Sequence, residues 1–304
     1  MKLDKPSLQW IAFLALALTW GSSFILMKKG LDSFSGLQVA SLRIFISFLF
    51  LSPIIIKNFR KIKRSQWKHL FIAGLLGSGL PAVLFPIAQT EISSSITGIL
   101  NSLVPLFTVI IGLVFFKMEF RKLKMLGALL GLIGAIGLLL VSGGVSFAPE
   151  NSTYALLVVL ATVSYATNVN FIKIFLKEID AVNITSFGFL LIGPLAGTYL
   201  FSTNFIEIMQ TDETAWRNLF YISILAVFGT SIAVILFNML IKQVSAVFAS
   251  SVTYIIPVFA IIWGLLDGEM LQARQFVFVA TILTGVFIIN KDNRLERKEK
   301  RMGN

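Results

Sequence analysis

The chain has 304 residues, of which 56% are hydrophobic and 13% are charged, with a formal net charge of +11. Soluble domains carry roughly 25% charged residues, so this composition excludes an ordinary soluble protein and favours a membrane protein. The absence of cysteine excludes disulfides and thiolate metal sites, and basic residues spread over short segments between apolar runs argue against a nucleic-acid-binding face.

Hydrophobic runs long enough to cross a bilayer follow one another along the whole chain. About 20 mostly apolar residues are needed to cross roughly 30 Å of hydrocarbon as a helix. Ten such runs are present, at residues 8–27, 36–56, 70–90, 94–116, 123–142, 153–175, 181–201, 219–241, 246–266 and 275–290. They lack the alternating polarity of membrane β-strands, so we predict ten transmembrane helices. The first run has no small-residue cleavage pattern and is expected to remain as a helix.

The distribution of lysine and arginine predicts the orientation. With the N-terminus in the cytoplasm, 21 basic residues fall on the cytoplasmic side and four on the other, while Arg43 lies inside a span. Positively charged loops resist translocation, so both termini are predicted to be cytoplasmic, with a basic tail after residue 290. Short loops without appended domains favour a multi-pass protein of the bacterial plasma (inner) membrane.

An internal repeat divides the chain. A shift of 152 residues places Phe85 over Phe237 and Pro105 over Pro257 without a gap, and a shift of 145 places the segment that begins at Trp20 over the one that begins at Tyr165. We therefore predict two repeats, residues 1–145 and 146–304. Because five spans is an odd number, the second copy enters the membrane from the opposite side. The predicted fold is all-α and polytopic, with two inverted five-helix repeats around a central cavity.

Four motifs carry a family resemblance: Trp20-Gly21-Ser22-Ser23-Phe24, Leu42-Arg43-Ile44, Pro105 through Gly112 to Glu119, and Pro257 through Gly264 to Gly268-Glu269. With the ten spans and the repeat, they resemble the EamA-type transporters of the drug/metabolite transporter superfamily. The resemblance covers nearly the whole chain and implies a ten-helix basket that exports or imports amino acids and related metabolites. Two departures, Met118 in place of the usual glycine and a ninth span shorter by two residues before its Gly-Glu, imply remodelled loops.

Arg43 is an ionisable residue within a predicted span, which costs about 2.5 kcal/mol or more at the bilayer centre. It lies about seven residues, roughly 10 Å, inside the outer end of the second span. The equivalent position of the second half is Ile184. Two interpretations stay open: Arg43 extends outward or bonds backbone carbonyls, or it faces the cavity and holds a substrate carboxylate or phosphate.

Prolines within the spans are predicted helix kinks. Pro105 and Pro257 leave the carbonyls of Asn101 and Thr253 without their usual helical donor. Such groups are tolerated against protein or a water-filled cavity, so these kinks either line the path or serve packing alone. The third span carries similar breaks and an amide one turn on: Pro81, Pro86 and Gln89.

Polar and aromatic residues at mid-depth complete the candidate substrate-binding set. These further candidates are Trp20, Ser22, Ser23, Tyr165, Asn168 and Asn238. Such residues also hold membrane helices together by hydrogen bonds, and both interpretations stay open. A stripe of glycines in the fifth span, from Gly127 to Gly137, instead indicates close helix packing.

No soluble-enzyme signature or nucleotide-binding loop is present, and His69 is isolated. No Asp or Glu falls mid-span, which argues against proton-coupled export of cationic drugs. We predict a non-enzymatic transporter of small metabolites, amino acids or related zwitterionic or anionic solutes, by alternating access, with export as the expected direction. The alternative is an integral membrane enzyme acting on a lipid-linked substrate. The expected partners are a small-molecule substrate and the lipid bilayer, with no cofactor, metal or nucleic acid, and the protein is a monomer or a homodimer.

Overall fold

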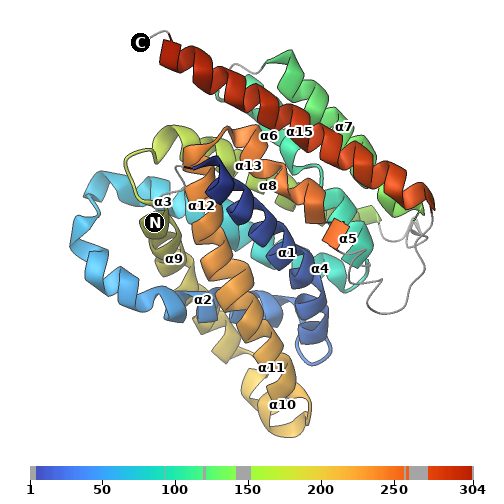
Figure 1. Cartoon of the computed structure of the whole chain (residues 1–304). Helices are drawn as coiled ribbons and strands as arrows, with labels where there is room; N and C mark the ends of the chain where they lie inside the picture. The colour runs from blue at the N-terminus through green and yellow to red at the C-terminus, as the bar shows by residue number, and fades with distance from the viewer. Residues whose placement is uncertain are drawn as a thin grey trace.

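The computed structural model describes residues 5–92, 94–118, 121–141, 152–256, 258–259 and 273–302. Every regular element in these ranges is a helix (Figure 1). Such an architecture is the expected one for a chain in lipid, where a helix satisfies its own backbone hydrogen bonds.

Within the described residues, six helical segments are long and apolar enough to cross a membrane: Pro6–Leu31, Gly36–Lys61, Arg64–Gln89, Thr153–Phe175, Ala181–Ser202 and Ala215–Gln243. They match the first, second, third, sixth, seventh and eighth predicted spans. Four of them are built on single helices: α1 (Pro6–Leu31), α2 (Gly36–Asn58), α8 (Ser152–Phe175) and α9 (Ala181–Ser202). Two are composite: α3 (Trp67–Gly74), η3 (Leu75–Gly79) and α4 (Leu80–Gln89), and α11 (Ala215–Ile224), η5 (Leu225–Ile232) and α12 (Ala233–Gln243).

The remaining described helices are η1 (Phe59–Lys61), η2 (Arg64–Gln66), α5 (Ser94–Asn101), α6 (Val104–Val114), α7 (Lys122–Val141), α10 (Phe205–Thr211), α13 (Ala246–Ser250) and α15 (Ala273–Met302). Helix α15 continues as a helix through most of the segment predicted as a basic tail. It packs along α7, and the two lie side by side in Figure 1. The glycine stripe makes this contact: a Cβ on Gly127 would lie 2.7 Å from Ile289 Cγ1.

The fourth predicted span is wrong as one continuous helix, because the structure divides it into α5 and α6. The Leu103 amide bonds the Leu100 carbonyl at 3.1 Å, a tight turn that ends α5 just before Val104 and Pro105. Proline has no backbone N–H and clashes with the preceding turn, which weakens the regular helix at this point. The ninth span is apolar and helical over Ala246–Ile256. Pro257, Glu119 and residues 260–272, which include Gly268-Glu269, lie outside the described residues.

η3 and η5 are both π-helical, and they lie at corresponding places in the two halves. The 152-residue shift moves residues 75–79 onto 227–231, which fall inside η5. A π-helix inserts one residue per turn, so it changes which side chains face the bundle interior and frequently marks a functional site.

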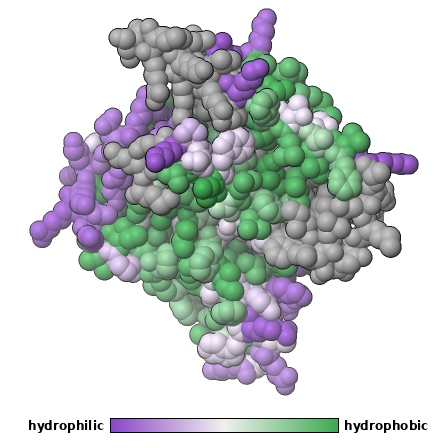
Figure 2. Space-filling model, in the orientation of Figure 1, coloured by the Kyte–Doolittle hydropathy of each residue, from purple (hydrophilic) through white to green (hydrophobic). Residues whose placement is uncertain are grey.

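Two buried apolar clusters lie toward opposite ends of the bundle. Phe13 and Leu16 of α1 belong to one cluster, and Met27 belongs to the other. Large apolar side chains are also exposed on the outside, among them Leu195 and Phe287. Figure 2 shows hydrophobic residues across the middle of this face, with hydrophilic residues at its lower tip and left edge. The exposed apolar surface is suited to lipid contact.

Candidate functional site

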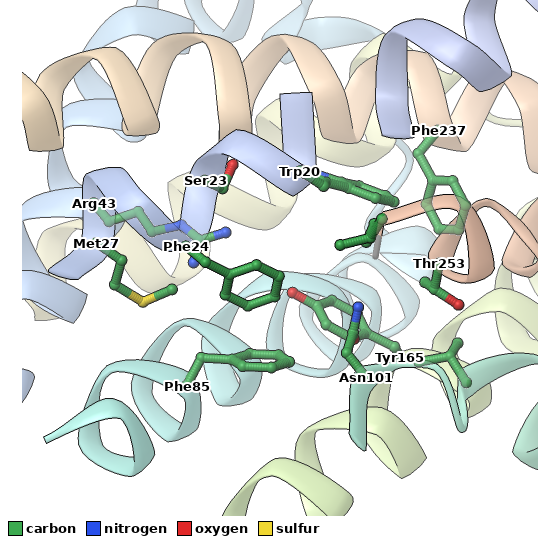
Figure 3. A pocket seen from close by; sticks show the side chains of 12 residues that line it. Trp20, Ser23, Phe24, Met27, Arg43, Phe85, Asn101, Tyr165, Phe237 and Thr253 are labelled. Carbon is green, nitrogen blue, oxygen red and sulfur yellow. The ribbon is translucent and has the colours of Figure 1, made fainter. Parts of the chain in front are cut away.

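A cavity lies between helices of both halves (Figure 3). Along α1 it falls between the two apolar clusters. Its lining residues are Trp20, Ser23, Phe24, Met27, Arg43, Phe85, Asn101, Val104, Tyr165, Phe237, Thr253 and Ile256. None of these residues is acidic, so the one charge in the lining that the described residues form is the guanidinium of Arg43.

Arg43 is held at the cavity by neutral hydroxyl groups. Its side chain is 8% exposed, and its Nε donates to Thr230 Oγ1 at 2.6 Å. Tyr165 also interacts with this guanidinium. No carboxylate of the described residues is among the groups that interact with Arg43. The guanidinium therefore keeps donor capacity beside an open space, where an anion has room to bind.

The cavity walls are aromatic, and η5 fixes one of them. Trp20 Nε1 donates to the Gly229 carbonyl at 3.0 Å, and the Trp20 ring packs edge-on against Phe237 at 5.0 Å. On the other side, the Phe85 and Tyr165 rings lie 6.0 Å apart. Figure 3 shows the Trp20 and Phe237 rings on one side of the cavity and the Phe85 and Tyr165 rings on the other. Rigid rings of this kind exclude water while the few polar groups set specificity.

A second region adjoins the first, and both are lined by Trp20, Arg43, Tyr165 and Phe237. The residues that line the second region alone are Gly77, Ser78, Asn168, Thr230, Val234 and Asn238. Both π segments contribute to it: Gly77 and Ser78 belong to η3, and Thr230 belongs to η5.

Three asparagines that line the cavity have buried amide oxygens without a hydrogen-bond partner. They are the Oδ1 atoms of Asn101, Asn168 and Asn238. Asn101 lines the first region and the other two line the second. A buried acceptor left without a donor costs about 1 to 3 kcal/mol, so these atoms favour a donor from water or from a ligand.

The structure brings most of the predicted binding residues together. Trp20, Ser23, Arg43, Asn101, Tyr165 and Thr253 line the first region, and Asn168 and Asn238 join in the second. Ser22 and Gln89 line neither region. The hydroxyl of Ser22 donates to the Leu18 carbonyl at 2.9 Å, and Gln89 is the last residue of α4.

Two of the four predicted kink positions, Pro81 and Pro105, lie next to irregular backbone. Pro81 follows η3 in the first turn of α4, and Pro86 lies inside α4. Pro105 begins α6, where Ser102 Oγ of the preceding turn approaches the Thr253 carbonyl at 3.5 Å. The two carbonyl-bearing positions singled out in the sequence, Asn101 and Thr253, thus both lie at the cavity.

Sequence reasoning missed Thr230, the partner of Arg43, and the apolar lining residues. A signal was present, because the 152-residue shift places Gly77-Ser78-Gly79 over Gly229-Thr230-Ser231. Small and hydroxyl-bearing residues repeated mid-span indicate close helix approach and local hydrogen bonding. Phe85 and Phe237 were aligned by the same shift but were not assigned to the site.

A metal centre finds no support in the part of the chain that the structure describes. No group of three or more His, Cys, Asp or Glu side chains lies close enough there to hold a metal ion.

Similar proteins come from bacteria and archaea. A relative from Archaeoglobus fulgidus, named an uncharacterized transporter, is 27% identical over 286 residues, which are 92% of this chain and 98% of the relative. YedA of Escherichia coli K12, named an uncharacterized inner membrane transporter, is 27% identical over 292 residues, covering 91% and 89%. A solved crystal structure superposes with a TM-score of 0.72 over 95% of this chain and 99% of that chain, at 17% identity. The fold is therefore shared with it.

Two segments of the chain, residues 8–140 and 152–291, match the model of the EamA-like transporter family. The resemblance predicted from the motifs is confirmed. The names of the relatives indicate a transporter rather than an enzyme. Since the matched segments cover most of its length, the chain belongs to the EamA-like transporter family and is a multi-pass membrane transporter.

Proposed function

We propose that this protein exports a small zwitterionic or anionic metabolite, an amino acid or a related solute, by alternating access. The observation that carries the proposal is Arg43, a buried cation beside a cavity whose described lining residues include no acid. We place the transporter in a bacterial inner membrane with both termini in the cytoplasm, because 21 of its basic residues then fall on that side.

Arg43 is costly to bury, which is why we assign it a binding role. An arginine at the centre of a membrane helix costs about 2.5 to 3.5 kcal/mol on insertion scales. Its partners Thr230 and Tyr165 supply hydroxyl groups and no negative charge. A substrate carboxylate would add planar, charge-assisted hydrogen bonds. A cationic drug would be repelled at the same place, since like charges interact strongly in a medium of low dielectric constant.

Contacts exchanged between the two halves support two inverted repeats, residues 1–145 and 146–304. Ser23 of α1 lies against η5: a Cβ on Gly229 would lie 2.7 Å from Ser23 Oγ. Asn168 of α8 lies against η3, where a Cβ on Gly77 would lie 2.2 Å from Asn168 Nδ2. The repeat shifts of 145 and 152 residues relate these two contacts. Two copies of one five-helix unit, related by a pseudo-twofold axis, would pack in this way and give ten spans in total.

The irregular segments give the halves places to move. η3 and η5 lack the regular α-helical ladder, and the break before Pro105 separates α5 from α6. We propose that the halves rock about these points and open the cavity to each side of the membrane in turn. Movement at such segments disturbs fewer backbone hydrogen bonds than bending a regular helix.

Counterflow in proteoliposomes tests the proposal. Vesicles that contain the purified protein and an unlabelled amino acid should accumulate its labelled form, and the assay is run with each of the twenty L-amino acids. We expect uptake of at least one of them, and we expect Arg43→Gln to reduce it at least about tenfold by removing a charge-assisted pair. Ser22→Ala is the matched control, because Ser22 lines neither region of the cavity.

Two results would contradict the proposal. Equal leak with and without protein across the whole panel would exclude amino acids as substrates, and unchanged uptake by the Arg43 variant would exclude its role. Direction is tested in cells, where the active protein should raise tolerance to a toxic amino-acid analogue and the Arg43 variant should not.

A further inference from the structure

The second region of the cavity combines two unpartnered acceptors, Asn168 Oδ1 and Asn238 Oδ1, with the Arg43 guanidinium, which also lines the first region. We propose that Asn168 and Asn238 form a subsite for the ammonium group of a zwitterionic substrate whose carboxylate binds Arg43. This inference rests on the proposed function and adds which residues recognise the amine. Both asparagines are buried, at 6% and 3% exposure, and each leaves its Oδ1 without a hydrogen-bond partner.

The hydrogen bonds of Thr185 determine which way the Asn238 amide faces. Thr185 Oγ1 donates its single proton to the Ala181 carbonyl at 3.0 Å, so this oxygen is left to accept from Asn238. Asn238 Nδ2 donates to it at 2.9 Å. The amide cannot be reversed without opposing two acceptors, so the free atom of Asn238 is its carbonyl oxygen.

Asn168 packs closely against η3 because Gly77 has no side chain. A Cβ there would lie 2.2 Å from Asn168 Nδ2 but 3.4 Å from Oδ1. The nitrogen therefore faces the π segment, and the oxygen, which has no hydrogen-bond partner, lies farther from it. Asn168 and Asn238 together line both the second region and a small adjoining space.

Equivalent positions of the two repeats differ in polarity. The pair Arg43 and Thr230 corresponds, by shifts of 141 and 152 residues, to Ile184 and Ser78. Ile184 and Ser78 line the adjoining space. One half thus carries a guanidinium, and the equivalent place in the other half carries an apolar side chain beside two amide oxygens. A zwitterion has the charge separation that this arrangement matches.

The amine of a zwitterion fits these acceptors better than an inorganic cation does. An ammonium group brings three N–H donors, and hydrogen bonds from a charged donor are stronger than neutral ones. Sodium would satisfy the same oxygens, but Arg43 lines the same region and would repel a lone cation in a low dielectric. A zwitterion brings its own carboxylate to the guanidinium and avoids this repulsion.

The test compares each transported L-amino acid with its des-amino carboxylic acid as an inhibitor of counterflow. With the wild-type protein we expect the amino acid to inhibit at least about tenfold more strongly, because the des-amino acid leaves the amide oxygens without a donor. Asn168→Leu and Asn238→Leu should reduce this preference to less than about threefold, mainly by raising KM for the amino acid. Inhibition by the des-amino acid should stay unchanged. Asn168→Asp, which keeps an acceptor at the position, should retain the preference.

Each outcome separates this inference from the proposed function. Both leucine variants could retain the full preference for the amino acid over its des-amino acid while matching the wild type in gel-filtration elution and in Tm. That result would overturn the subsite and leave the proposed function standing. A sodium requirement that Asn168→Leu abolishes would assign the site to an inorganic cation and would also overturn it. Loss of fold in both leucine variants leaves the decision to Asn168→Asp, which overturns the subsite if its preference is lost. Failure of the wild type to move any amino acid would overturn both proposals.

Discussion

Gly77 determines how closely η3 approaches α8. A Cβ at this position would lie 2.2 Å from Asn168 Nδ2, so Gly77→Ala must displace the amide or the helix. We expect counterflow to fall at least about tenfold, since overpacking of this kind costs about 1 to 3 kcal/mol. Gly79→Ala is the matched control in the same π segment, because its Cβ would lie 3.4 Å from its nearest neighbour. Equal activity of the two variants would contradict this prediction.

Asp212 anchors a hydrogen-bonded turn outside the spans. The backbone N–H and the hydroxyl of Thr214 both donate to Asp212 Oδ1 at 2.8 Å, and Asn218 Nδ2 donates to Ser33 Oγ at 2.7 Å. Hydrogen bonds from Ser33 and then from Thr214 lower the pKa of Asp212 below its ordinary value of 3.8. The carboxylate is therefore the form that ties the turn between α1 and α2 to the turn between α10 and α11.

The lowered pKa of Asp212 predicts a dependence of stability on pH. A depressed native pKa stabilises the fold above the unfolded-state pKa, and this stabilisation is lost as the pH falls below about 4. Asp212→Asn should lower the Tm at pH 7, and the difference from wild type should shrink at pH 3. Thermal melts in detergent measure this, with Glu207→Gln on α10 as the control. A difference that is independent of pH would contradict the assigned role of the carboxylate.

Among the elements, a lysine of α8 and a lysine of α12 each bind backbone carbonyls next to the end of the other helix. Lys173 of α8 donates to the Ile241 carbonyl at 2.6 Å and to the Val244 carbonyl, at the C-terminal end of α12. Lys242 of α12 donates to the carbonyls of Lys177, at 2.7 Å, and Ile179, in the turn that follows α8. The last carbonyls of α12 have no intrahelical donor, and a cation also interacts favourably with that end.

These lysine-to-carbonyl hydrogen bonds predict a loss of stability when either lysine is replaced. Lys173→Met or Lys242→Met should destabilise by about 1 to 3 kcal/mol, which corresponds to about 2 to 4 °C in Tm for each kcal/mol. Lys177→Met, at an exposed lysine of the same region, should change the Tm by less than about 1 °C. Melting curves with equal shifts for all three variants would instead indicate a general effect of charge.

At the scale of the whole molecule, inverted topology has a direct test. The 152-residue shift relates Lys61 to Glu213, both of which are exposed. Inverted repeats place these two positions on opposite sides of the membrane, whereas parallel repeats place them on the same side. The chain has no cysteine, so single cysteines can be introduced without background.

We expect a membrane-impermeant maleimide to label Glu213→Cys in intact cells. The same reagent should label Lys61→Cys only after the cells are permeabilised, since Lys61 belongs to the basic cytoplasmic loop. Labelling of both variants in intact cells would contradict the inverted arrangement.

The sequence alone predicts the six spans that the described residues show, because a bilayer requires about 20 apolar residues for each crossing, and its motifs indicate the family. It also singled out Arg43, whose charge is conspicuous in an apolar run. The folded structure shows which polar side chains contact one another. It placed Thr230 on Arg43, left Ser22 and Gln89 outside the cavity, and broke the span before Pro105. The reason is physical: hydropathy fixes where a helix lies along the membrane normal, whereas π segments and helix packing fix how its side chains are rotated.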